Sequence, residues 1–119
     1  MSRIQSFKDL LVWQKAMDLV VKLYEITAAY PADERFGLTA ETRKTARSVP
    51  YNIAEGKTRF SVHEYRHFIS IARGSLGELE TQIILAGRLK YLGAESIANL
   101  EENVEEIARM SRGLEQSLS

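Results

Sequence analysis

Apolar residues recur at intervals of three and four along almost the whole chain, and no segment shows the alternation of a β-strand. The pattern predicts four helices, over residues 9–29, 38–57, 62–92 and 95–118. Short connections between consecutive helices favour antiparallel neighbours. The sequence therefore predicts an all-α fold, an antiparallel up-down-up-down four-helix bundle, in which residues 1–119 form one domain.

Two of these boundaries carry specific signals. Ser61 and Glu64 have the spacing of a capping box, which marks the start of the third helix, and Gly93 is a matching stop signal. Small residues at Gly74 and Gly77, with Ser75 between them, lie beside the apolar stripe of this helix. They would let another backbone approach closely, which explains why glycine is tolerated there.

The second helix contains a proline, within the run 47–56. Proline in a helix interior costs roughly 3 kcal/mol because one hydrogen bond is lost and the ring clashes with the preceding turn. We expect a helix kinked at Pro50, with Asn52 bonding a carbonyl that Pro50 leaves unpaired and Glu55 completing an inward-facing polar network.

The first helix is more apolar than one bundle requires. At 100° per residue its apolar side chains cover roughly 220°, whereas one packed face needs about 100°. We expect the excess to form a subunit interface that includes Trp13, Val21 and Ile26. The alternative is a central helix that contacts three neighbours within one chain.

Composition narrows the class of protein. The chain has no cysteine, which excludes disulfides and thiolate chemistry. No apolar run approaches the roughly 18 residues of a membrane span, and the first residues lead directly into charged ones rather than a signal peptide. We expect a soluble cytoplasmic protein without membrane contact.

Charge is unevenly distributed although the net charge is zero. Residues 35–73 contain eight basic and three acidic residues, whereas residues 74–119 contain four and eight. Rows of guanidinium groups suit phosphate oxygens, so the middle third predicts a nucleic-acid-binding face. The alternative is pairing with the acidic last helix. The candidate binding residues are Arg43, Lys44, Arg47, Lys57, Arg59, Arg66 and Arg73.

One motif resembles a catalytic metal site. The run from His63 to His67 matches H-E-x-x-H, the zinc-binding helix of metallopeptidases. Its context argues against zinc, because Tyr65 faces the core and so turns both histidines to solvent, and because Glu64 already has a capping role. There is also no Ser/His/Asp arrangement and no glycine-rich phosphate loop. We expect no metal, no cofactor and no enzymatic activity.

The run 48–56, followed by Phe68, Ala72, the pair Gly74-Ser75 and the pair Glu78-Leu79, resembles the family of four-helix bundle proteins, or 23S rRNA intervening sequence proteins. The resemblance covers about residues 7–114. It implies a small bacterial cytoplasmic protein that assembles as a closed homopentamer and has no established biochemical role. Three residues depart from the family pattern, namely Glu41, Lys44 and Thr45, and Glu41 in particular weakens the basic face of the second helix.

Two hypotheses follow from these observations. The first is a non-enzymatic homo-oligomer that binds RNA or another nucleic acid through the phosphate backbone. The second is a protein-interaction scaffold without direct nucleic-acid binding, for example an accessory subunit of a nucleic-acid enzyme. A similar pentameric bundle serves diversity-generating retroelements in that way, but this parallel is an analogy between folds.

Overall fold

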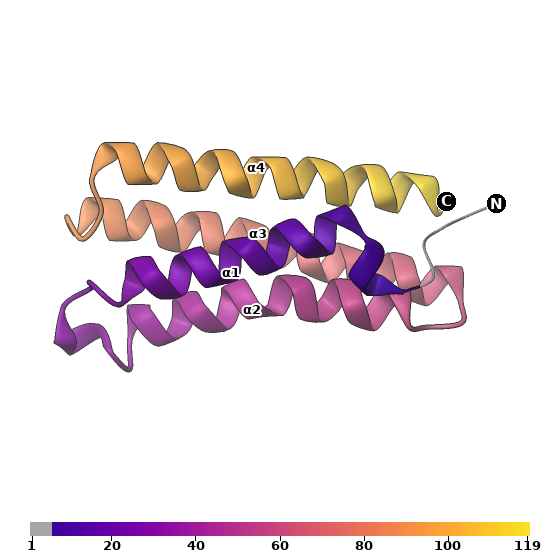
Figure 1. Cartoon of the computed structure of the whole chain (residues 1–119), viewed down its shortest axis with the longest axis horizontal. Coiled ribbons are helices and arrows are strands. Elements are labelled where there is room, and N and C mark those ends of the chain that lie inside the picture. Colours follow the sequence, from indigo (N-terminus) through magenta and orange to yellow (C-terminus); the bar gives the residue numbers. More distant parts are fainter. Residues whose placement is uncertain (1–5) are drawn as a thin grey trace.

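The computed structural model of the chain describes residues 6–119, and four long helices form nearly all of it (Figure 1). They are α1 (Leu11–Thr27), α2 (Leu38–Lys57), α3 (Val62–Arg88) and α4 (Ala94–Ser117), with short 3-10 helices at Phe7–Asp9 (η1) and Ala32–Glu34 (η2). Consecutive helices run in opposite directions, so that α1 begins and α4 ends at the same end of the bundle (Figure 1). Residues 6–119 contain no strand, which confirms the predicted all-α, up-down-up-down bundle.

The helices occupy the corners of a four-sided bundle. Over residues 6–119, α1 packs against α2 and α4 but not against α3, so α1 and α3 lie on opposite sides. Every helix sends apolar side chains to a common core, where Leu23, Ile53, Ile83 and Ile107 are almost completely buried. Full burial of such a side chain stabilises the fold by roughly 1.5–3 kcal/mol.

A buried glycine brings α2 and α3 close together near their connection. A Cβ atom on Gly56 would lie 3.0 Å from the Cβ of Phe68 and 3.1 Å from the carbonyl oxygen of Tyr65. A larger residue would require the neighbouring backbone and side chains to shift by a few tenths of an ångström. The Gly56 position therefore fixes how α2 is placed on α3 at this end of the bundle.

Pro50 lies inside α2, which continues as helix on both sides of it. The proline ring is fully buried in the core, and Asn52 Nδ2 donates to the carbonyl oxygen of Ser48 at 2.7 Å. In a regular helix the N–H at position 50 would donate to the carbonyl of Ala46, and proline has no N–H. Asn52 therefore supports the backbone near Pro50 through the carbonyl of Ser48 and not through that of Ala46. The prediction that Glu55 packs inward is wrong, because its side chain is exposed and pairs with Arg59.

The predicted start of α3 is confirmed and its predicted end is not. Ser61 Oγ accepts from the N–H of Glu64 at 3.2 Å, which is one half of the capping box. The helix ends at Arg88 rather than at residue 92, because Lys90 adopts a left-handed conformation (φ 67°) and turns the chain. The N–H of Tyr91 closes this turn by donating to the carbonyl of Ala86 at 2.8 Å. Gly93 instead precedes the first turn of α4.

One buried polar pair links α2 to α3. Gln82 Nε2 donates to the hydroxyl of Thr45 at 3.0 Å, and both side chains are buried. A hydroxyl at position 45 is thus matched to a buried amide on the facing helix. Gln82 Oε1 has no hydrogen-bond partner within the described chain.

Within residues 6–119, no helix combines the length and the apolar character needed to cross a membrane.

Candidate interaction surfaces

Two arginines of α2, Arg43 and Arg47, contact α1. Arg43 lies beside the last turn of α1, where its Nε donates to Thr27 Oγ1 at 2.9 Å and its Nη2 donates to the carbonyl of Tyr24 at 3.1 Å. The guanidinium also stacks 4.5 Å from the centre of the Tyr24 ring, and Arg47 donates to the Tyr24 hydroxyl at 2.7 Å. A cation at a helix C-terminus satisfies free carbonyls and opposes the helix dipole. Both arginines are therefore already engaged within the bundle, while Lys44 between them is exposed.

Two arginines of α3, Arg66 and Arg73, contact the last turns of α4. Arg73 Nη1 lies 2.6 Å from Glu115 Oε1, and Arg66 Nε donates to the backbone carbonyl of Glu115 at 3.2 Å. This arrangement matches the alternative in which the basic middle third pairs with acidic α4. Arg66 and Arg73 thus join two helices rather than presenting free charge along a face.

Lys57 and Arg59, two further candidates for nucleic-acid binding, lie at the end of α2 and in its connection to α3. Arg59 pairs with Glu55 at 2.7 Å and with Glu64 at 3.3 Å, and its guanidinium lies 4.7 Å from the centre of the Phe68 ring. Lys57 lies near the ring of Tyr65, with Nζ 5.9 Å from its centre. Glu64 therefore uses its carboxylate to hold Arg59 and not to complete the capping box.

The same connection carries aromatic and imidazole groups. Phe60 is fully exposed, with 107% of the reference accessible area. A cavity of about 360 Å³ at the start of α3 is lined by Arg59, His63, Glu64, His67 and Phe68, and not by Phe60. We call Arg59, Phe60, His63, His67 and Phe68 the turn cluster. Sequence reasoning missed this cluster because Phe60 lies outside every helical stripe.

Histidines 63 and 67 do not form a metal centre with other ligands. Both are exposed, and within residues 6–119 no group of three or more His, Cys, Asp or Glu side chains is placed to hold a metal ion. The two histidines lie one helical turn apart without a third ligand. The geometry gives the H-E-x-x-H match no support as a zinc site.

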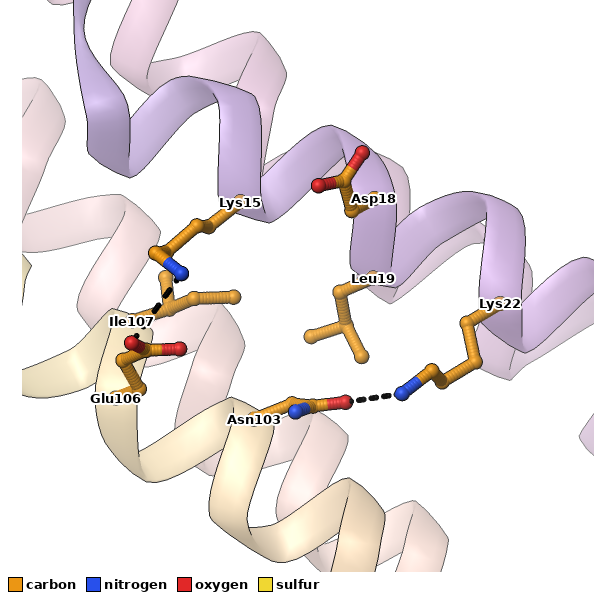
Figure 2. A pocket seen from close by; sticks show the side chains of 7 residues that line it. All are labelled: Lys15, Asp18, Leu19, Lys22, Asn103, Glu106 and Ile107. Atoms are coloured by element: carbon orange, nitrogen blue, oxygen red, sulfur yellow. Dashed lines mark hydrogen bonds and ion pairs between the residues drawn. The ribbon is translucent and has the colours of Figure 1, made fainter.

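A groove separates α1 from α4, and polar side chains close it. Lys15 Nζ lies 3.3 Å from Glu106 Oε2, and Lys22 Nζ donates to Asn103 Oδ1 at 2.7 Å. Figure 2 shows both pairs joining α1 to α4, with Leu19 and Ile107 also lining the groove. The cavity measures about 210 Å³. Each lysine ammonium is already paired across the groove. No nucleophile lies beside a base among its lining residues, so the groove has no catalytic arrangement.

Shifted pKa values mark structural contacts and no catalytic pair. Hydrogen bonds from the N–H of Leu38 and from the Tyr91 hydroxyl lower the pKa of Glu34, and the bond to Glu34 raises the pKa of Tyr91. Burial raises the pKa of Tyr30 and Tyr65. These groups lie in the bundle ends and in helix contacts. Within the described residues, none of these four groups is hydrogen-bonded to a serine, threonine or lysine side chain that could act as a nucleophile.

The structure separates the three residues predicted for a subunit interface. Trp13 and Ile26 are half-buried and pack against the core of their own chain, and Trp13 lies edge-on to the ring of Phe7. Val21 is 57% exposed. Part of the excess apolar arc of α1 is thus used within the chain, and part remains on the surface.

A second exposed apolar surface lies on α3, where sequence reasoning did not place one. Added Cβ atoms at Gly74 and Gly77 would meet no atom within 4 Å, so neither glycine serves close packing inside this chain. The signal was present in the sequence, because apolar residues fall outside the core stripe of this helix. We define the α3 outer face by its exposed apolar and small residues, namely Ser70, Ile71, Gly74, Gly77, Thr81, Ile84 and Leu85.

Comparison with known proteins gives a family and a fold. Residues 8–113 match the model of the 23S rRNA-intervening sequence protein family. A solved structure from Bacteroides thetaiotaomicron VPI-5482, described as a protein with unknown function from the S23 ribosomal protein family, superposes with a TM-score of 0.83. The two chains are 18% identical, and the alignment covers 89% of this chain and 96% of that one. None of the curated proteins compared with the chain matches it.

Proposed function

This chain belongs to the 23S rRNA-intervening sequence protein family, and from that premise we propose that it is a non-enzymatic protein that assembles with copies of itself into an interaction scaffold. The α3 outer face is the observation that carries this proposal. Glycine inside a helix costs about 1 kcal/mol relative to alanine. Gly74 and Gly77 face open space among the exposed apolar residues Ile71, Ile84 and Leu85, which leaves room for another chain to approach this face closely.

A second exposed apolar surface supports assembly in a closed ring. Leu11, Met17 and Val21 of α1 are exposed, and α1 lies on the side of the bundle opposite α3. Two different apolar surfaces on one chain favour head-to-tail contacts, which close into rings when the rotation permits. A ring of five copies, as the family resemblance implies, is an assembly of this kind.

The contacts of the basic residues favour the scaffold over a broad nucleic-acid-binding face. Arg43, Arg47, Arg66 and Arg73 each contact another helix, and Arg59 is held by two carboxylates. Phosphate binding would have to replace these contacts. In a protein that binds the phosphate backbone, the basic side chains are free to contact phosphates and to displace the counterions of the nucleic acid.

Light scattering at micromolar concentration tests the assembly. We expect a mass that is a multiple of the 13.5 kDa chain, and we expect Gly74→Leu and Gly77→Leu to shift the protein to monomer while leaving its helical circular dichroism intact. Gly113→Leu is the matched control, because Gly113 is also an exposed helical glycine with open space around it. A monomeric parent protein, or equal loss of assembly in the Gly113 variant, would contradict the proposal.

A pull-down from the native host tests the scaffold role. The assembled protein should recover a stoichiometric protein partner that remains after nuclease treatment. Recovery of RNA alone would favour the nucleic-acid alternative instead.

A further inference from the structure

A cavity lies where the end of α1 meets the start of α2. It measures about 220 Å³, and its lining includes Thr27, Arg35, Thr39 and Arg43. Among the described residues, no aspartate or glutamate lines this cavity. Its walls therefore carry positive charge alone, in contrast to the groove between α1 and α4, which is lined by residues of both charges.

Arg43 is held in place without a carboxylate partner. Its Nε and Nη2 donate to Thr27 Oγ1 and to the carbonyl of Tyr24, which are both neutral acceptors. Its Nη1 has no hydrogen-bond partner in the described part of the chain. Arg59 and Arg73 differ, because each is paired with a carboxylate. Arg43 thus offers a fixed guanidinium with free N–H groups, which loses little conformational entropy when an oxyanion binds.

Arg35 brings a second guanidinium to the same cavity. It directly follows η2, is exposed, and forms no ion pair within the described residues. The neighbouring carboxylate of Glu34 is not part of the lining, and its oxygens accept hydrogen bonds from Leu38 and Tyr91. Two guanidinium groups without carboxylate partners repel each other, and an anion that enters the cavity offsets this repulsion.

Thr39 is a buried polar residue of the lining that has no hydrogen-bond partner. It is 8% exposed, and its hydroxyl forms no hydrogen bond with the described residues. Buried hydroxyl groups in proteins nearly always have a partner, so this one indicates a bound group in the cavity. Thr39 is also the second residue of α2, where the N–H groups lack helical partners and the helix dipole favours an anion.

We propose that this cavity binds the phosphate group of a small molecule, with Arg35, Arg43 and the Thr39 hydroxyl donating to its oxygens. The tetrahedral oxygens of phosphate accept from several donors at once, whereas a carboxylate offers two oxygens in one plane. A single phosphate needs only the donors that Arg43 leaves free, so the contacts of Arg43 with α1 remain. The cavity lies within one chain, so the inference does not depend on the assembly proposed above.

An NMR titration of isotopically labelled protein tests the inference, with inorganic phosphate and methyl phosphate as probes at constant ionic strength. We expect saturable shifts of the backbone N–H of Thr39 and of the Nε–H of Arg43. Arg35→Gln should weaken binding by about tenfold or more, since one charged donor is lost, and Thr39→Val by about threefold to tenfold. Binding of either probe supports the inference, and the tighter of the two shows whether the ligand is free phosphate or an ester.

Arg88→Gln is the matched control. Arg88 is exposed at the end of α3, at the same end of the bundle, and does not line the cavity (Figure 1). Its substitution removes the same charge as Arg35→Gln and should leave the affinity for phosphate within about twofold of the parent protein.

Four results would overturn the inference. They are the absence of saturable shifts at Thr39 and Arg43 with both probes, equal effects of the Arg35 and Arg88 substitutions, full affinity in a folded Thr39→Val variant, and equally tight binding of acetate. If Thr39→Val does not fold, Arg35→Gln at its exposed position decides the outcome. Light scattering on the same samples separates this inference from the assembly proposal, because a monomer that binds phosphate contradicts assembly alone.

Discussion

Glu34 and Tyr91 join the two connections at one end of the bundle. The Tyr91 hydroxyl donates to Glu34 Oε2 at 2.8 Å across 57 positions of sequence, and Glu34 Oε1 accepts from the N–H of Leu38 at the start of α2. Tyr91 also lies against Tyr30, with ring centres 5.4 Å apart. The Glu34 carboxylate thus accepts a hydrogen bond from the first residue of α2 and another from the connection between α3 and α4.

This contact predicts a loss of stability in acid. The pKa of Glu34 in the folded protein is lowered from its ordinary value of 4.5, so the unfolded chain binds a proton more readily. The stabilisation is therefore present above pH 4.5 and is lost as the pH falls through the lowered pKa. Urea unfolding between neutral pH and pH 3 should show a smaller acid loss in Glu34→Gln than in the parent protein. Glu41→Gln, an exposed carboxylate in the first turn of α2, should retain the parent's pH dependence.

The left-handed residue at the end of α3 predicts a stabilising substitution. Lys90 has φ 67°, a conformation that costs a residue with a Cβ roughly 1–2 kcal/mol and glycine far less. Lys90→Gly should raise the free energy of unfolding by about 1 kcal/mol. Lys90→Ala removes the same charge and keeps the Cβ, so it should give no such gain. Equal stabilities of the two variants in chemical denaturation would contradict the argument.

The contacts of Arg43 with α1 should contribute to the stability of the fold. Arg43→Ala removes two hydrogen bonds to the end of α1 and the stacking on Tyr24, so it should lower the free energy of unfolding by about 1–2 kcal/mol. Lys44→Ala, at the exposed neighbouring position, should change stability by less than about 0.5 kcal/mol. If both variants are as stable as the parent in thermal unfolding, Arg43 does not hold α1.

The buried pair of Thr45 and Gln82 predicts non-additive substitutions. Thr45→Val leaves the Gln82 amide without its partner and should cost about 1–3 kcal/mol. Thr45→Val combined with Gln82→Leu removes both polar groups and should cost less than the two single changes together. Denaturation of the four proteins in this cycle measures the coupling. Additive costs would show that the hydrogen bond contributes nothing.

Local signals accounted for most of the architecture. The period of apolar residues predicted the helices, and Ser61 with Glu64 predicted where α3 begins. The end of α3 could not be predicted because Lys90 adopts a conformation usually taken by glycine, and the following residue, Tyr91, is held by a contact with Glu34. That contact joins segments far apart in the sequence.

The candidate binding residues were much harder to judge from the sequence. Arg73 and Glu115 are 42 positions apart, and Arg43 reaches the end of the preceding helix. A sequence shows that a residue is basic, but only the fold shows whether its charge is already used. Phe60 was missed for the opposite reason, since an isolated aromatic residue in a connection belongs to no periodic pattern.

Gly56 also bears on the order in which the bundle forms. Its missing side chain lets α2 and α3 touch beside a connection of only a few residues, so this helical hairpin closes at small entropic cost. Contacts that are close in sequence form early in folding, whereas those between α1 and α4 must wait for the whole chain. We therefore expect the helical hairpin of α2 and α3 to form before α1 packs against α4.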